Sequence, residues 1–466
     1  VDIHDANITG GSGNDTLDVS AIATAKEINL DAGAGDDTVT IGAAILKGSA
    51  TLAQDTLNGG DGTDTLVMTG ALANGQTAAN SVGITNFEKL KISNALAVAI
   101  TAKNVQAGLS QIILADAANG GSITFEAGAS QLSILNSLAG ALTLADTGTG
   151  TTDSLTITGE TATTDDMGDG NNLVINGIET VTIDTTTKNV AANDTDDQDF
   201  GTITMTSDTG GTDTLKVIGT GVFDTGVITA DVIDFSGMDG SNHAATVALA
   251  DMTGSVPVGV TTIIGSSHKD ILVGDAKSTI NGGGGNDTIT GGSGNDTLNG
   301  EDGNDTIDAS GGGNDTVTGG AGNDTFTFAA TLNASDSVDG GDGTDTLSVT
   351  NGSLTTLQGL TISEANTFNA NLKSVEVLAV GANMDTTGDS FDLGYVGGVS
   401  TVQLNSLAND AETIAGFESG NTLKLTVATT QDLTATINNA ATGTADVFNV
   451  TTASPAAGTD YNQLTV

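Results

Sequence analysis

Residues 282–327 read GGGGNDTIT, GGSGNDTLN and GEDGNDTID, then one extra residue, Ala309, then SGGGNDTVT and GGAGNDTFT. Each unit has nine residues, with a Gly-rich start, Asp at position six and an apolar residue at position eight. A short period of this kind is typical of an architecture in which successive units stack on one another. We interpret the extra Ala309 as a tolerated bulge.

The nonapeptide predicts a six-residue turn followed by a short strand. Glycine permits the positive φ angles of such a turn and leaves the backbone carbonyl oxygens accessible. The Asp at position six adds a carboxylate at the end of the turn. Carboxylate and carbonyl oxygens are the ligands that Ca²⁺ prefers, and one turn supplies too few of them, so stacked turns should share each ion. The repeat therefore predicts multiple calcium ions.

Two nonapeptides should form one coil of a parallel β-roll, so that aspartates from alternate units stack. Asp287 should lie over Asp305, and Asp305 over Asp324, along one edge; Asp296 should lie over Asp315 along the other. The eighth positions should fill a thin core, and they are Ile289, Leu298, Ile307, Val317 and Phe326. Because this core is small, metal binding should supply much of the folding free energy. We also expect replacement of Asp305 to be worse than replacement of Asp287, because Asp305 faces two neighbouring coils.

The predicted calcium ligands come from the tandem array and from related single copies of the repeat. Their sixth-position carboxylates belong to Asp287, Asp296, Asp305, Asp315, Asp324, Asp270, Asp15, Asp37, Asp64 and Asp345. Backbone carbonyls at turn positions one and three belong to Gly282, Gly284, Gly291, Ser293, Gly300, Asp302, Gly319 and Ala321. Third-position side chains that should add a carboxylate are those of Asp61, Asp302 and Asp342.

Composition favours cations as partners and argues against nucleic acid. The 466 residues include 65 Gly, no Cys and 11 Lys+Arg against 58 Asp+Glu, a net charge of −47. A nucleic-acid-binding protein needs a basic face, so we expect no DNA or RNA partner. Roughly two dozen divalent cations would neutralise this charge. No apolar run approaches the ~18 residues of a membrane span, so we expect none.

The regions without a strict period are also predicted to be β-rich. They contain short runs of alternating Thr, Val, Ile and Leu, broken by Gly, Asn or Asp. Three phrases, ITNFEKLKIS at 84–93, INGIETVTID at 175–184 and NLKSVEVLAV at 371–380, each place a Glu before an apolar strand. The best helix candidates are residues 18–28 and 104–115.

We predict an elongated all-β protein, in which parallel β-roll segments join β-solenoid or β-sandwich-like segments. Four segments are expected: an interrupted β-roll at 1–70, a β-rich segment at 71–262, the main calcium β-roll at 263–348 and a C-terminal β-rich segment at 349–466. The pattern leaves open whether 71–262 forms a solenoid or separate sandwiches.

These nonapeptides resemble the repeats-in-toxin (RTX) family, whose β-rolls bind calcium and whose members leave Gram-negative bacteria by type I secretion. The order of blocks over about residues 30–330, from AGAGDDTVTIG through TTDSLTITG to the tandem array, also resembles the lattice-forming part of Caulobacter-type surface-layer proteins. That resemblance implies an extracellular, two-dimensional lattice of identical copies on the bacterial cell surface. It also implies a lipopolysaccharide anchor in a separate part, so we expect this chain to be a fragment, a processed form or a relative anchored differently.

Catalysis is not expected from the residues present. The three histidines, His4, His243 and His268, form no HExxH motif, and no Ser lies in a GxSxG motif. We therefore expect no catalytic residues and no organic cofactor. The alternative that stays open is a calcium-dependent adhesin or biofilm-matrix protein, a class that usually shows long, near-identical repeats and a distinct ligand-binding module.

Overall fold

A computed structural model shows two compact units, Val1–Gly240 (unit 1) and Ser241–Val466 (unit 2). The residues that the structure describes are 5–22, 27–42, 55–148, 152–159, 170–186, 198–206, 211–219, 223–238, 246–248, 261–274, 277–329, 332–382, 390–393, 396, 398–405, 412–417, 420–426, 433–437, 449–452 and 464–465. Strands predominate among them, and the predicted all-β class is confirmed.

Unit 1 is a stack of coils in which the chain passes from one sheet to another with each successive strand. Even-numbered strands pair in chain order, and they are β2 (Thr16–Asp18), β4 (Thr38–Thr40), β6 (Thr65–Met68), β8 (Lys89–Ile92), β10 (Gln111–Leu114), β12 (Ala129–Ile134), β14 (Ser154–Gly159), β16 (Thr180–Asp184), β18 (Thr214–Gly219) and β20 (Val232–Met238). Four odd-numbered strands form a second sheet, namely β1 (Asp5–Gly11), β3 (Glu27–Gly33), β5 (Thr56–Asn58) and β7 (Ile84–Thr85). Six more form a third, namely β9 (Ala99–Thr101), β11 (Ser122–Phe125), β13 (Leu142–Asp146), β15 (Asn171–Asn176), β17 (Gln198–Thr206) and β19 (Phe223–Thr229).

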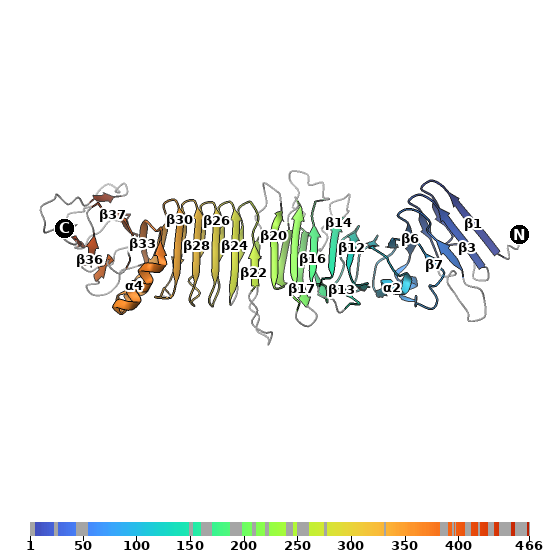
Figure 1. Ribbon diagram of the computed structural model, residues 1–466, viewed down its shortest axis with the longest axis horizontal. Coiled ribbons are helices and arrows are strands. Elements are labelled where there is room, and N and C mark those ends of the chain that lie inside the picture. Colours follow the sequence, from blue (N-terminus) through green and yellow to red (C-terminus); the bar gives the residue numbers. More distant parts are fainter. Residues whose placement is uncertain are drawn as a thin grey trace. The chain divides into compact units, whose positions relative to one another are not determined.

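Unit 2 has the same organisation. One row of strands pairs in chain order and comprises β22 (Thr261–Ile264), β24 (Ser278–Gly284), β26 (Thr297–Asp302), β28 (Thr316–Ala321), β30 (Ser337–Asp342) and β32 (Leu372–Lys373). The other row comprises β21 (Thr246–Ala248), β23 (Ile271–Val273), β25 (Thr288–Thr290), β27 (Thr306–Asp308), β29 (Thr325–Phe328), β31 (Thr346–Thr350), β33 (Val377–Ala382), β35 (Thr401–Leu404), β37 (Thr422–Leu425) and β39 (Asn449–Thr452). A small further sheet contains β34 (Ser390–Asp392), β36 (Glu412–Phe417), β38 (Leu433–Ile437) and β40 (Leu464–Thr465). Strands β24, β26, β28 and β30 lie side by side in Figure 1.

Each eighth-position apolar side chain of the tandem array is buried within a short strand. In β25, β27 and β29, Ile289 pairs with Ile307 and Ile307 with Phe326, and all three side chains are buried. Leu298 and Val317 stack in the same way in the opposite row and are also buried. The threonines that flank them point outward, as the period of two in a strand requires. The predicted thin core of eighth-position side chains is therefore confirmed.

Two glycines show why the turns between these strands need residues without a side chain. Gly285 and Gly303 have φ angles of 116° and 142°, which L residues with a Cβ rarely adopt. A Cβ on Gly285 would lie 2.5 Å from the carbonyl carbon of His268, and one on Gly303 would collide with the carbonyl oxygen of Gly285. Close stacking of one coil on the next therefore depends on these glycines.

The region at 71–262, for which the sequence left two architectures open, continues as a solenoid through its described residues. From β8 to β20 every described strand pairing is parallel, as in β8–β10 and β16–β18. Separate sandwiches would be built mainly from antiparallel strands. The loops between strands vary in length here, which hides the repeat from a search for a fixed period.

The helix predictions were largely wrong. Residues 27–28 of the candidate at 18–28 begin β3, and residues 111–114 of the candidate at 104–115 form β10. Residues 23–26 lie outside the described residues. The helices observed are α1 (Gly70–Asn74), α2 (Ala102–Val105), α3 (Asn351–Gln358) and α4 (Ile362–Asn371). Two of them, α1 and α2, are single turns, and α3 and α4 have only 8 and 10 residues, so no extended amphipathic pattern marks them in the sequence.

The extra residue of the tandem array is not a strand bulge. Ala309 follows the end of β27 and is buried, while β27 pairs with both of its neighbours without a register shift. The insertion is absorbed between the strand and the next turn, because the strand itself is fixed by its two ladders.

We predict that Leu298→Ala destabilises the calcium-loaded chain by about 2–5 kcal/mol, because it opens a cavity in a core only one side chain thick. The measurement is urea unfolding at a fixed calcium concentration, with Thr297→Ala as the control. Thr297 is adjacent but half-exposed. A Leu298→Ala midpoint equal to that of the control would contradict the buried position of this strand.

Candidate metal centre

Aspartates at position six form a continuous ladder along one edge of unit 2. The backbone N–H of Asp287 donates to Oδ1 of Asp305 at 2.8 Å, and the N–H of Asp305 donates to Oδ1 of Asp324 at 2.8 Å. The ladder begins at Asp270, whose N–H donates to Asp287 Oδ1 at 2.7 Å, and continues from Asp324 to Asp345 at 2.8 Å. Each carboxylate therefore receives one hydrogen bond from the coil before it.

A second ladder follows the opposite edge. The N–H of Ser278 donates to Oδ1 of Asp296 at 2.8 Å, and the N–H of Asp296 donates to Oδ1 of Asp315 at 2.9 Å. Asp315 in turn donates to Oδ1 of Asp336 at 2.8 Å. The two rows of aspartates run along the two edges predicted from the period.

Unit 1 contains a shorter ladder of the same kind. The N–H of Asp15 donates to Asp37 Oδ1, and that of Asp37 to Asp64 Oδ1, both at 2.7 Å. Asp37 and Asp64 are buried, whereas Asp15 is half-exposed and its Oδ2 accepts the N–H of Gly11 at 2.8 Å. The scattered single copies of the repeat are therefore coils of one stack.

The second oxygen of these carboxylates is buried and has no hydrogen-bond partner. These atoms are Oδ2 of Asp37, Asp64, Asp287, Asp296, Asp305, Asp324 and Asp345, in residues that are at most 2 % exposed. An unpaired buried carboxylate oxygen is costly, so a row of them requires a compensating positive charge.

The space beside several of these oxygens is bordered by a backbone carbonyl of the next coil. A Cβ built on Gly282 would lie 2.5 Å from Asp287 Oδ2 and 2.7 Å from the carbonyl oxygen of Gly300. The carbonyl of Gly319 and Oδ2 of Asp305 border the equivalent space at Gly300. Carboxylate and carbonyl oxygens facing one small space, where a side chain would not fit, form a donor set suited to Ca²⁺.

The donor set also explains why the described residues contain no cluster of metal-binding side chains. Within the described part of the chain, no group of three or more His, Cys, Asp or Glu side chains gathers as a metal centre. A site of the nonapeptide kind contains few side chains, because much of its oxygen comes from the backbone. The residues present therefore fit a calcium ion held largely by main-chain carbonyls.

Burial raises the pKa of several ladder carboxylates. The pKa of Asp287 rises to about 7, mainly through loss of solvent, with the charges of Asp270 and Asp305 adding to the rise. Burial also raises the pKa of Asp296 to about 6, with the charge of Asp315 contributing. The pKa of Asp336 rises to about 6 for the same reasons. The folded protein by itself thus disfavours the charged form that a cation would bind.

The third turn positions play a different part from the first. The carbonyls of Asp302, Ala321 and Asp342 accept backbone N–H groups from the coil before, each at 2.8 Å. The predicted third-position side chains of Asp61, Asp302 and Asp342 are exposed. Asp270 is buried, but its Oδ2 accepts the backbone N–H and the hydroxyl of Ser266 at 2.7 and 3.0 Å. Asp270 therefore differs from the interior ladder residues.

Asp336 is a ladder residue that sequence reasoning missed. It lies in ASDSVD, without the glycines that a search for the repeat depends on, and its Oδ2 accepts the N–H of Asn333 at 2.7 Å. The signal that could have found it is an Asp followed by Ser or Thr and an apolar strand residue. Of the three histidines, His4 and His243 lie outside the described residues, and His268 Nδ1 lies 3.2 Å from Ser267 Oγ.

The family model for the RTX calcium-binding nonapeptide repeat (4 copies) matches residues 5–21, 50–67, 274–307, 309–330 and 332–353. The chain carries RTX calcium-binding nonapeptide repeats. The matched segments include most of both RTX ladders in unit 2 and two coils of the ladder in unit 1. No curated protein matches the chain. Among the described residues, no helix is long and apolar enough to cross a membrane.

We expected replacement of Asp305 to be worse than replacement of Asp287, but the aspartate ladder in the RTX repeats of unit 2 gives no basis for that difference. Asp287 accepts from Asp270 and donates to Asp305, so it too has a coil on each side. The expectation counted a neighbouring coil on only one side of Asp287, whereas the repeat-like residues 265–273 place Asp270 in the coil before it.

We therefore predict that Asp287→Asn and Asp305→Asn raise the calcium concentration needed for half-maximal folding by similar factors, each about tenfold or more, or about 1.4 kcal/mol. Circular dichroism during calcium titration measures this. Asp302→Asn, which removes an exposed carboxylate, is the matched control and should change little. A much larger effect at Asp305 than at Asp287 would contradict the equivalence of the two coils.

We also predict that, in the presence of a chelator, the folded state loses stability as the pH rises from about 4 to about 7. Carboxylates with raised pKa values keep their protons in the folded chain over this window, while the unfolded chain releases them. The folded fraction in chelator, measured by circular dichroism at several pH values, reports the trend, and Asp287→Asn should make it shallower. Stability that rises with pH in chelator would contradict the burial of these groups.

Proposed function

We propose that the chain is a structural protein of a bacterial surface layer, which folds on binding calcium and assembles into a two-dimensional lattice of identical copies. The observation that carries this proposal is the row of buried carboxylate oxygens without hydrogen-bond partners, such as those of Asp287, Asp305 and Asp324. A bound calcium ion would supply both the missing partner and the missing charge. Folding would then depend on the calcium concentration around the chain.

Calcium-dependent folding suits a protein that is exported before it acts. Inside a bacterium, where free calcium is low, the net charge of −47 would oppose compaction of the chain. Outside the cell, calcium would neutralise the ladders and the solenoid would form. The RTX repeats support this part of the proposal, and type I secretion is the export route that we propose.

Lateral assembly would use carboxylates that the ladders leave on the surface. In unit 2, the side chains of Asp302 and Asp342 occupy third turn positions and are exposed. Copies carrying such rows would repel one another unless further divalent ions bridge them. The order of sequence blocks over residues 30–330 supports the same function, and the varied loops between coils would offer different contacts to different neighbours.

We predict that the purified chain forms ordered sheets in a few millimolar calcium and that chelation dissolves them. Electron microscopy shows the sheets, and circular dichroism on the same samples reports folding. Ordered sheets that disappear with chelator support the lattice. Folding without assembly would overturn the lattice function and favour an adhesin or matrix protein.

A paired variant separates lattice calcium from folding calcium. Asp302→Asn combined with Asp342→Asn leaves both buried ladders intact, so circular dichroism in calcium should match that of the unmodified chain. Sheets should become fewer or less ordered. Unchanged sheets would exclude these two carboxylates from the lateral contacts.

A further inference from the structure

Three turns outside the nonapeptide pattern share one form. Each contains a residue with positive φ, then a buried apolar residue, then a glutamate, and each is followed by a strand. The turns are Asn86-Phe87-Glu88, Gly177-Ile178-Glu179 and Ser374-Val375-Glu376. The first residues have φ angles of 56°, 72° and 49° respectively. These are the phrases in which the sequence placed a Glu before an apolar strand, and we refer to them as the Glu turns.

Each Glu turn accepts the ladder hydrogen bond from an aspartate of the preceding coil. The N–H of Asp64 donates to Glu88 Oε2 at 2.8 Å, and the N–H groups of Asp153 and Asp345 donate to Glu179 and Glu376 Oε2 at 2.9 Å. We call each aspartate and the N–H that it accepts one rung of the ladder. The glutamate therefore occupies the place that an aspartate has in an ordinary rung.

The main chain of the Glu turns that end the RTX ladders differs from that of the other coils. The carbonyl of Asp345 accepts two N–H groups, from Glu376 at 3.2 Å and Val377 at 2.9 Å. In an ordinary rung, the carbonyl of Asp287 accepts from Thr306, the residue after the ladder aspartate of the next coil. At Glu88 and Glu376, the carbonyl of the ladder aspartate before the turn is thus shared between two successive N–H donors.

The pair Asp153 and Glu179 lies outside the segments that match the RTX repeat. Asp153 is 5 % exposed and Glu179 is 4 % exposed. Asp153 Oδ1 accepts the N–H of Gly128, and Glu179 Oε2 accepts the N–H of Asp153. The other oxygen of each carboxylate, Asp153 Oδ2 and Glu179 Oε1, is buried without a hydrogen-bond partner. Each of these two atoms, in neighbouring coils, needs a positive partner.

The carboxylate of Asp146 borders the space beside Asp153 Oδ2. Gly148 precedes Asp153 by five residues, as Gly282 precedes Asp287 in the RTX array. A Cβ on Gly148 would lie 2.8 Å from Asp146 Oδ2 and 3.0 Å from Asp153 Oδ2. The carboxylate of Asp146 thus lies near Asp153 Oδ2, much as the backbone carbonyl of the next coil lies near the aspartate Oδ2 in the RTX sites.

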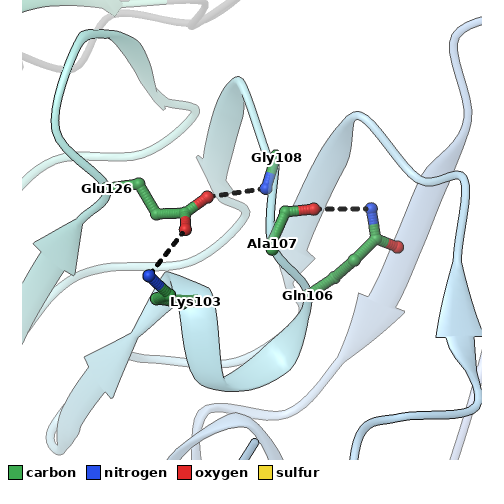
Figure 2. Close-up of polar contacts among 5 residues, drawn as sticks. All are labelled: Lys103, Gln106, Ala107, Gly108 and Glu126. Carbon is green, nitrogen blue, oxygen red and sulfur yellow. Dashed lines mark hydrogen bonds and ion pairs between the residues drawn. The ribbon is translucent and has the colours of Figure 1, made fainter.

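Another glutamate of unit 1 shows a carboxylate that the protein itself satisfies. Figure 2 shows Glu126 beside Lys103 and Gly108. Its Oε1 lies 3.7 Å from Lys103 Nζ, and its Oε2 accepts the N–H of Gly108 at 2.6 Å. Glu126 therefore has a cation and a donor from the chain, which Glu179 Oε1 and Asp153 Oδ2 lack.

We propose that Asp153 and Glu179 bind one hard divalent cation of the calcium class, at a site outside the RTX repeats that the Asp146 carboxylate borders. Oxygen-only donors favour calcium over zinc. The Glu turns at Glu88 and Glu376 accept the same ladder hydrogen bond at the ends of the RTX ladders, but their carboxylates are half-exposed, so the proposal is confined to Glu179. This inference does not depend on lattice formation.

The test is to count calcium ions bound to the full chain by equilibrium dialysis and elemental analysis, in calcium sufficient to fold it. Asp153→Asn combined with Glu179→Gln keeps the size of both side chains, and we expect one ion fewer per chain. Glu126→Gln is the matched control and should bind the same number as the unmodified chain. An unchanged count in the double variant would overturn the proposal.

A second measurement needs no variant and guards against one that fails to fold. A crystal structure of the unmodified chain in calcium should contain an anomalous peak about 2.3–2.6 Å from Asp153 Oδ2 and Glu179 Oε1. A water molecule or no density at that point would overturn the proposal. Neither result bears on sheet formation, so failure of this site and failure of the lattice function are distinguishable.

Discussion

The hydrogen bond from an aspartate N–H to the carboxylate of the next coil is the interaction on which the architecture depends. It fixes the register of each coil, because Asp287 and Asp305 must stack for it to form. It also uses one oxygen of each carboxylate and leaves the other facing the turn, buried and unpaired. The same contact that aligns the coils therefore accumulates negative charge along the edge, and the stack is complete only with cations between its turns.

The size of the core makes this dependence unavoidable. The short strands of the tandem array bury their eighth-position apolar side chains, such as Ile289 and Leu298, and the strands are only a few residues long. Burial of so little apolar surface offsets only part of the conformational entropy that the roughly 18 residues of a coil lose on folding. The many glycines increase that loss. Neighbouring coils must therefore stabilise each other, and calcium ions shared between turns would add to that coupling.

The sequence predicted the part of this fold in which spacing is constant. In the tandem array, ladder partners are 18 or 19 residues apart, so stacking, core positions and edges followed from the period. Elsewhere the same ladder bond joins residues 22, 27 or 31 apart, as at Asp15, Asp37 and Asp345, because loops of different length connect the coils. The solenoid at 71–262, Asp336 and the role of the Glu turns could not be derived from spacing. The division into four segments stays a prediction.

The ends of a ladder face a different electrostatic problem from its interior. At the first rung the chain supplies its own donors: Gly11 N–H satisfies Asp15 Oδ2, and Ser266 satisfies Asp270 Oδ2. At the last rung no further aspartate follows, and a Glu turn accepts the final N–H instead, as at Asp345. Interior carboxylates have neither solution, since every nearby N–H is already used in the stack. Cations are therefore required where the repeat is most regular. At the end of a ladder, a glutamate accepts the last backbone N–H, so one ladder can end and another begin along the chain without an unsatisfied donor at the break.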